Sequence, residues 1–227
     1  MTLRLLLPVI ALMLGGAADR KNPTCPADPN WSANPVMQLT FRQSGNSRIL
    51  LAEGAIDTGL VARLGVALKK YKPIDEIWLR SPGGDAVTGN QAGLLIRKAG
   101  LATRIPAGWA CFSACNFVFM GGAVRSVDPG GVFMVHMFTV TADGGVRAEE
   151  MTQGYDQAVQ GIARVEQDAA LLASQDNDFL IKAGVSRKLL TEVMYRQKAV
   201  AGRSRDQSTR RCLTPAELRK YSVVNAG

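Results

Sequence analysis

The chain has 227 residues, of which 47% are hydrophobic and 20% charged, which excludes a disordered chain and allows one domain with a substantial core. Its 27 Lys and Arg against 19 Asp and Glu give a net charge of +8, and the basic excess is marked over residues 187–211. Because Tyr195 is the single aromatic residue there, this stretch favours a solvated basic face, which could lie near anionic lipid, over a nucleic-acid partner.

The first 18 residues are predicted to be a secretory signal peptide. Arg4 precedes an apolar run over residues 5–14, and small residues follow before Asp19. This run is short for a membrane span, which needs about 20 residues. We therefore expect an exported protein. The alternative is that residues 1–18 are not cleaved and anchor the chain in the membrane.

Residues 19–38 are predicted to form an extended leader, because four prolines lie between residues 23 and 35. Residues 39–227 are predicted to form a single domain, since no linker-like stretch interrupts them.

Strands and helices are predicted to alternate in the first part of this domain. Short apolar runs predict strands at residues 49–52, 77–79, 103–105 and 132–136, and helical spacing predicts helices that begin near residue 60, at residue 87 and after Ser113. Asp57 or Thr58 is predicted to cap the first helix, and Gly100 to end the second. This alternation indicates a largely parallel α/β sheet with right-handed crossovers.

The pattern after residue 136 is mainly helical. A long helix is predicted over residues 149–175 and a second over 186–196, and residues 202–211 are predicted to be a polar loop. The long helix carries one apolar stripe, formed by Tyr155, Val159, Ile162, Val165, Ala169 and Leu172. A short final helix is predicted to start with Thr214 as N-cap, Pro215 at N1 and Glu217 at N3.

The four cysteines are candidates for two disulfides, because export places them in an oxidising compartment. Pairing by proximity joins Cys111 to Cys115 and Cys25 to Cys212, one of three connectivities. The first bond would brace the turn between its cysteines, and the second would join the two ends of the mature chain. The competing interpretation is a zinc site of three cysteines and His136, whose spacing matches no compact ligand pattern.

Ser113 is the candidate nucleophile. Apolar residues that predict a buried helix follow it, so its hydroxyl is expected at a helix N-terminus, where the backbone N–H of Ala114 is unpaired. Gly83 and Gly84 offer further backbone N–H groups that a substrate can approach. The competing interpretation is that Ser113 is only an N-cap and the glycines are only a turn.

His136 is the only histidine of the chain and therefore the only candidate general base of its type. At the end of its predicted strand it would face Ser113. A histidine among apolar neighbours can also be a core residue whose ring nitrogens bond to the backbone.

Six segments carry a resemblance to a known family. They are Gly54-Ala55-Ile56-Asp57, residues 79–85, Pro106-Ala107-Gly108, residues 111–115, Val135-His136 and residues 212–224. In this order they resemble the ClpP-like serine peptidases of the ClpP/crotonase superfamily, in particular their exported, periplasmic branch. The resemblance implies an α/β fold, a superhelix of repeated strand–strand–helix units with a C-terminal helical extension.

The resemblance also implies roles for individual residues. Ser113 matches the nucleophile and His136 the base, and the backbone at Gly83, Gly84 and Ala114 matches the oxyanion hole. The aspartate that completes the family's triad corresponds to Arg210 here. The nearest acidic residue, Asp206, is the candidate acid, and Asp156 on the long helix is an alternative.

The implied function is a serine endopeptidase that cleaves peptides or flexible polypeptide segments through an acyl-enzyme, without a cofactor or metal. Cytoplasmic relatives receive unfolded chains from an ATP-driven unfoldase. An exported protein has no ATP at hand, so we expect no ATPase partner. Ring-like assemblies are usual in the family, so we expect a homo-oligomer.

Two other functions are compatible with these residues. Arg210 at the position of the acid favours an inactive protein that keeps the fold for binding or assembly. A crotonase-type acyl-CoA enzyme has a similar glycine-rich oxyanion hole, but the Ser–His pair and the predicted export argue against it.

Overall fold

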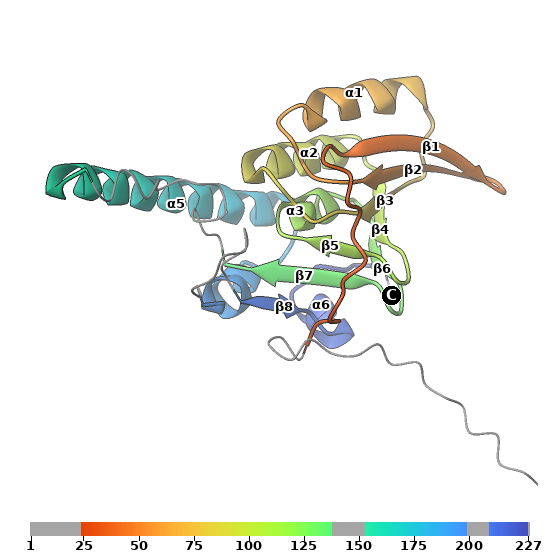
Figure 1. Ribbon diagram of the computed structural model, residues 1–227. Coiled ribbons are helices and arrows are strands. Elements are labelled where there is room, and N and C mark those ends of the chain that lie inside the picture. The colour runs from red at the N-terminus through yellow and green to blue at the C-terminus, as the bar shows by residue number, and fades with distance from the viewer. Residues whose placement is uncertain (1–23, 138–152, 199–208, 227) are drawn as a thin grey trace, which may run out of the picture.

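The computed structural model describes residues 24–137, 153–198 and 209–226. The predicted signal peptide and Asp206 lie outside the described residues. Among the described residues, no helix is long and apolar enough to cross a membrane. Two β-sheets, a layer of helices and one long projecting helix make up this part of the chain (Figure 1).

The first sheet has five strands in the order β1-β2-β3-β4-β6. These strands are β1 (Gln38–Ser44), β2 (Ser47–Glu53), β3 (Glu76–Arg80), β4 (Ala102–Ile105) and β6 (Arg125–Val127). β1 pairs antiparallel with β2, and all other neighbours are parallel. The largely parallel α/β architecture is therefore confirmed. The predicted runs at 49–52, 77–79 and 103–105 lie within β2, β3 and β4.

Three helices pack against this sheet and bury the core (Figure 1). They are α1 (Leu60–Lys70), α2 (Ala86–Lys98) and α3 (Ala114–Met120). All residues of α3 are buried, as its apolar sequence predicts. The predicted cap of α1 is wrong: Gly59 is the N-cap, with no side-chain bond. Asp57 lies two residues before this N-cap, where its carboxylate accepts hydrogen bonds from the Gly59 N–H and from Arg63.

The second sheet has three strands in the order β5-β7-β8. These are β5 (Ala110–Phe112), β7 (Val132–His136) and β8 (Arg210–Cys212). β5 is parallel to β7, and β8 is antiparallel to it. A bridge between Ser81 and Cys111 joins the end of β3 to β5. The predicted loop over 202–211 is wrong at its end, because Arg210 and Arg211 belong to β8; a strand of three residues is too short to show periodicity.

The C-terminal helices differ in detail from the prediction. The long helix α5 (Tyr155–Ala183) ends beyond the predicted residue 175, and residues 149–152 lie outside the described residues. The regular helix predicted over 186–196 is wrong. A π-helical turn η2 (Leu189–Val193) and a 3-10 turn η3 (Met194–Arg196) occupy this stretch, and the wide π turn buries Leu189, Leu190 and Val193 together.

The last helix, α6 (Pro215–Lys220), begins with the predicted capping box. The Thr214 hydroxyl accepts a hydrogen bond from the Glu217 N–H, and the Glu217 carboxylate accepts one from the Thr214 N–H. This confirms the start of the helix read from the sequence.

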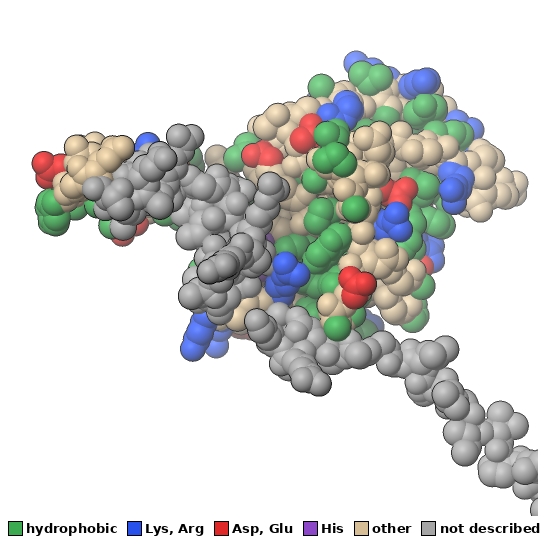
Figure 2. All heavy atoms as spheres, in the orientation of Figure 1, with side chains coloured by type: hydrophobic (Ala, Val, Ile, Leu, Met, Phe, Trp, Pro, Cys, Tyr) green, Lys and Arg blue, Asp and Glu red, His purple; other side chains and the backbone are tan. Residues whose placement is uncertain are grey.

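The N-terminal end of α5 projects away from both sheets (Figure 1). The side chain of Tyr155 in its first turn is 83% exposed, and Val159 and Ile162 are exposed as well. Hydrophobic side chains are visible on this projecting part in Figure 2. The apolar stripe predicted for the helix is therefore buried only toward its C-terminal end, from Leu172 onward.

A buried arginine joins the helices to the C-terminal segment. Arg125 in β6 is 2% exposed, and its guanidinium donates to backbone carbonyls that include those of Gly122, Ala183 and Val223. The Gly122 carbonyl follows α3, the Ala183 carbonyl ends α5 and the Val223 carbonyl follows α6. Carbonyls at the C-terminal end of a helix lack partners within the helix. Burial lowers the pKa of Arg125 to about 10, which leaves it charged at neutral pH.

Candidate active site

Ser113 lies at the sharp turn between β5 and α3. Its backbone has φ 58° and ψ −124°, a conformation that residues other than glycine rarely adopt and that costs about 1–3 kcal/mol. Ser113 is half-buried at the start of the helix. It is the N-cap residue of α3 by position, as the competing interpretation expects, but its side chain makes no capping bond to the helix.

The Ser113 hydroxyl instead contacts His136. The distance between Ser113 Oγ and His136 Nε2 is 2.7 Å. His136 ends β7, which lies next to β5 in the sheet, and the Ser113 N–H donates to the Met134 carbonyl at 3.4 Å. The parallel pairing of β5 and β7 therefore brings the two side chains together across 23 residues of sequence.

Gly83 packs directly against the Ser113 turn. A Cβ atom on Gly83 would lie 2.6 Å from the Phe112 carbonyl oxygen and 2.7 Å from Ser113 Cβ. The φ of Gly83 is also positive, at 88°. Only glycine lets the backbone approach the turn this closely. The Gly83 N–H donates to Ser81 Oγ at 3.1 Å.

The amides of Gly84 and Ala114 lie beside this close approach. The bridge between Gly84 and Ile56 uses the Gly83 carbonyl and the Asp85 N–H, which bond to Ile56 at 2.8 and 2.9 Å. In a parallel bridge of this kind the middle residue, Gly84, directs its own N–H away from the partner strand. Ala114 is the first residue of α3, so its N–H has no acceptor within the helix. One candidate donor, the Ala114 N–H, thus directly follows Ser113, and the other, the Gly84 N–H, directly follows the glycine that contacts the Ser113 turn.

Both predicted disulfides are confirmed. Cys111 is bonded to Cys115, with their Cα atoms 5.4 Å apart, so the bond closes the turn that contains Ser113. Cys25 is bonded to Cys212 over 187 residues, which ties the N-terminal segment to β8. The zinc alternative is wrong, because every cysteine is in a disulfide. Within the described ranges, no group of three His, Cys, Asp or Glu residues could hold a metal ion.

The position that the resemblance gives to the acid lies beside His136. His136 and Arg210 are directly opposite one another in the β7–β8 pair. The Arg210 guanidinium lies over the rings of Phe112 and Trp31, 5.0 and 5.3 Å from their centroids. Asp156 is in the first turn of α5, whose N-terminal end projects away from the sheets (Figure 1). Asp206 is outside the described residues.

Two aromatic residues near His136 were missed in the sequence. The Phe112 ring lies 4.6 Å from the His136 ring, centroid to centroid, and 5.7 Å from the stacked Trp31 ring. Phe112 directly precedes Ser113 and is the last residue of β5, which pairs with β7. Trp31 is the only aromatic residue in the proline-rich leader, residues 19–38. This isolation was the one sequence signal that pointed to it.

Comparisons with known proteins support the fold. No protein-family model and no curated protein matches the sequence. Among solved structures 394 chains match. One is a mutant of ClpP1 from Listeria monocytogenes, with a TM-score of 0.52 and 17% identity over 78% of this chain and 88% of that one. A likeness at this identity shows the fold alone, which is ClpP/crotonase-like, as the sequence predicts.

Proposed function

We propose that the chain is a serine endopeptidase in which Ser113 is the nucleophile and His136 the general base. The observation that carries this proposal is the 2.7 Å contact between Ser113 Oγ and His136 Nε2, made by a serine held at positive φ. A serine at a tight strand-to-helix turn, bonded to an imidazole, is the arrangement that acyl transfer requires. The ClpP/crotonase-like fold supports the same function.

In the proposed reaction Ser113 Oγ attacks the carbonyl carbon of a peptide bond. Its proton passes to His136 Nε2, which accepts it when the proton of the neutral ring is on Nδ1. The tetrahedral intermediate then collapses as the C–N bond breaks, and His136 delivers the proton to the leaving amine. Water, activated by the same imidazole, hydrolyses the Ser113 ester and restores the enzyme.

The backbone N–H groups of Gly84 and Ala114 are proposed to bind the oxyanion. Ala114 directly follows Ser113, Gly84 directly follows the glycine that packs against the Ser113 turn, and neither N–H is used by the local backbone pairing described above. Fixed backbone donors of this type each lower the barrier by about 3–4 kcal/mol. Gly83 contributes by its missing side chain, since its own N–H already donates to Ser81.

Asp206 is proposed as the acid that orients His136. It lies four residues before Arg210 in the sequence, and Arg210 is opposite His136 in the sheet. A carboxylate at the imidazole would stabilise the imidazolium that forms during attack.

We further propose that the protein works in an oxidising compartment, as a periplasmic or secreted homo-oligomer without an ATPase partner. Two disulfides support the compartment. The exposed apolar residues on the projecting end of α5 support self-association. The substrate would then be a peptide or an already flexible segment, because nothing unfolds it first.

The decisive experiment is labelling with a fluorophosphonate probe, which reacts with activated serines. Folded wild type should label, Ser113→Ala should not, and His136→Ala should label at least about 10³-fold more slowly. Cleavage of a casein-derived peptide mixture should follow the same order. A folded wild-type protein that does not label would contradict the peptidase.

The second candidate is an inactive protein that keeps the fold for binding or assembly. Arg210 favours it, because a guanidinium rather than a carboxylate is opposite the base. Absence of labelling together with a concentration-dependent oligomer would support this candidate. Turnover of a CoA thioester by the purified chain would instead indicate a crotonase-type enzyme.

A further inference from the structure

We propose that an N-terminal strap, residues 24–35, positions the His136 imidazole through Trp31 and Phe112. This inference rests on the proposed role of His136 as the base. It assigns a positioning function to a segment that precedes the sheets and makes no contact with the reacting atoms.

The strap is fixed to both sheets at several points. The disulfide from Cys25 to Cys212 holds one end at β8. The Ala110 N–H of β5 donates to the Asn30 carbonyl at 2.9 Å, and the Ala55 N–H donates to the Asn34 carbonyl at 2.9 Å. Figure 1 shows this segment running from β8 past β7 and β5 toward β1. The strap therefore crosses the strand that leads to Ser113 and the strand that carries His136.

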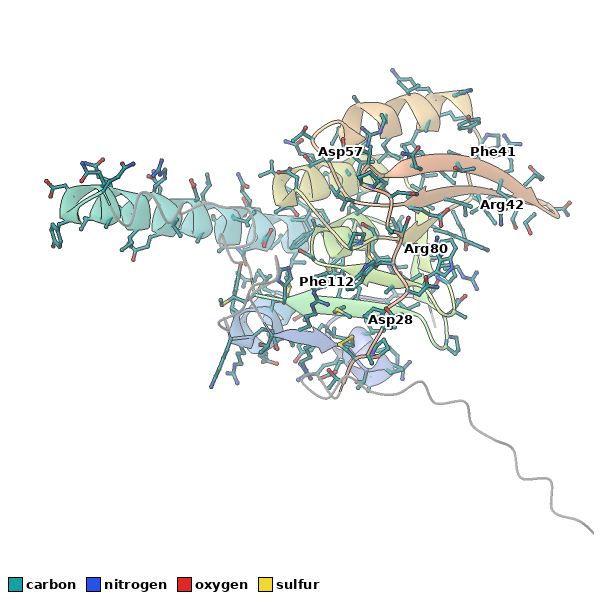
Figure 3. All side chains as sticks on the ribbon, viewed as in Figure 1. Asp28, Phe41, Arg42, Asp57, Arg80 and Phe112 are labelled. Atoms are coloured by element: carbon teal, nitrogen blue, oxygen red, sulfur yellow. A yellow bond between two sulfur atoms is a disulfide. The ribbon has the colours of Figure 1, made fainter. Side chains whose placement is uncertain are left out.

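Trp31 brings the strap into contact with the site. Its ring stacks on Phe112 with an interplanar angle of 20°, and Phe112 in turn packs against His136 at 4.6 Å and 40°. Figure 3 shows the labelled Phe112 between α3 and β7. The Arg210 guanidinium lies against both aromatic rings from β8. The His136 imidazole thus packs against the Phe112 ring, and Trp31 of the strap stacks on that same ring.

The strap is also needed to keep Phe112 buried. Phe112 belongs to a small cluster separate from the main core, whose buried members are Cys25, Phe112, Met134 and Cys212, with Trp31 and Val132 packed against them. The strap supplies Cys25 and Trp31. Without them the outer face of Phe112 would meet water, and the ring would lose the support that fixes its orientation.

This support matters because the orientation of the imidazole decides how Nε2 meets Ser113 Oγ, 2.7 Å away. The torsion about the Cβ–Cγ bond of a histidine has only a broad intrinsic preference, so contacts with the faces of the ring help to set its orientation. Contact with Phe112 restricts that rotation. A base displaced by about 1 Å can lose up to about 100-fold in rate, so loosening Phe112 should slow the chemical step.

The test compares Trp31→Ala with Trp78→Ala, which removes another partly buried tryptophan, from β3, at the Trp109 contact. Fluorophosphonate labelling of the full chain is measured from pH 5 to 9. The imidazole resonances of ¹⁵N-labelled protein without a polyhistidine tag are recorded in parallel. Since His136 is the sole histidine, these signals report on it alone.

Trp31→Ala should label about tenfold more slowly, with an altered pH profile and shifted imidazole signals, while Trp78→Ala should match the wild type in all three. Trp31→Phe, which keeps an aromatic ring, should recover most of the rate. For cleaved peptides the loss should appear in kcat more than in KM. If Trp31→Ala unfolds, Trp31→Leu, which keeps an apolar side chain but removes the stacked aromatic ring, should give the same changes.

Unchanged labelling and unchanged imidazole signals in a folded Trp31→Ala or Trp31→Leu protein would overturn the inference and leave the peptidase intact. If wild type does not label but its imidazole signals still shift on Trp31→Ala, the peptidase fails and the strap still positions His136. The two outcomes are therefore separable.

Discussion

The nucleophile and the base of the candidate site are held in different ways. Ser113 is fixed by its immediate neighbours: a disulfide spans four residues around it, and Gly83 packs against its turn. His136 is surrounded by segments from the two ends of the chain, since Arg210 is opposite it and Trp31 supports its aromatic neighbour. One half of the site is thus local in sequence, and the other depends on long-range contacts.

The largest expected effect contrasts the two disulfides. In the chain-entropy description, a disulfide stabilises a protein by restricting its unfolded chain, and the restriction grows with the length of the loop that the bond closes. Removing the bond therefore lowers the free energy of unfolding more when the loop is longer. Cys25→Ser/Cys212→Ser should lower the free energy of unfolding by about 5 kcal/mol and Cys111→Ser/Cys115→Ser by about 2 kcal/mol. Denaturant titration measures both. Equal losses would contradict the division into a local and a long-range half.

The next effect concerns the local half. Gly83→Ala should lower the free energy of unfolding by about 3 kcal/mol and abolish fluorophosphonate labelling, because its Cβ would meet Phe112 and Ser113 at under 3 Å. Gly108→Ala is the matched control, since Gly108 also has positive φ but has open space around it. It should cost about 1 kcal/mol and leave labelling unchanged. Equal labelling by both variants would show that the close approach is dispensable.

The next prediction concerns a buried carboxyl outside both halves of the site, whose protonation should change the stability of the protein without changing the geometry of the site. Asp176 on α5 is buried and accepts a hydrogen bond from Asn90, and burial raises its pKa to about 6. The folded state therefore binds the proton more tightly than the unfolded chain, so stability falls as pH rises from about 4 to 6. Asp176→Asn should remove this fall and add about 2 kcal/mol at pH 7 without changing labelling.

Thermal unfolding at pH 4 and pH 7 tests this prediction. At pH 4 the variant and the wild type should unfold at nearly the same temperature, because the carboxyl is mostly protonated when folded. A variant that is less stable at pH 7 would show that the ionised carboxylate stabilises the contact between α2 and α5.

The smallest expected effect lies at the start of α6, beside the long-range half. Thr214→Ala removes the capping box and should cost about 1 kcal/mol. Thr58→Ala, before a helix that has no side-chain cap, should cost almost nothing. Chemical denaturation of the two variants provides the comparison, and similar values for both would assign no energy to the cap.

The local half of the site was predictable from sequence for a physical reason. The turn at Ser113, the bridging cysteines and the buried helix α3 are neighbours along the chain, so composition and spacing report on them. The capping box of Thr214 is legible for the same reason. The ends of α5 were less predictable. Its apolar stripe has the same spacing in the exposed part as in the buried part, so the spacing does not tell the two parts apart.

The long-range half carries weaker sequence signals. β8 has three residues and pairs with a strand more than 70 positions earlier, so no periodicity marks it. The packing of Trp31 on Phe112 joins residues 81 positions apart. Pairing Cys25 with Cys212 was the one inference from sequence that linked the chain ends, and it follows from a count of cysteines rather than from any contact pattern.

The bond between Cys25 and Cys212 sets an order for the maturation of the protein. It joins two segments that are 187 residues apart, and in an oxidising compartment it can form only once β8 and the strap have come together. The turn around Ser113 can close much sooner, as Cys115 follows Cys111 by four residues. A chain that has just entered that compartment would therefore have the Ser113 turn closed before the strap is fixed, so under the proposed function full activity would follow only once the second disulfide has formed.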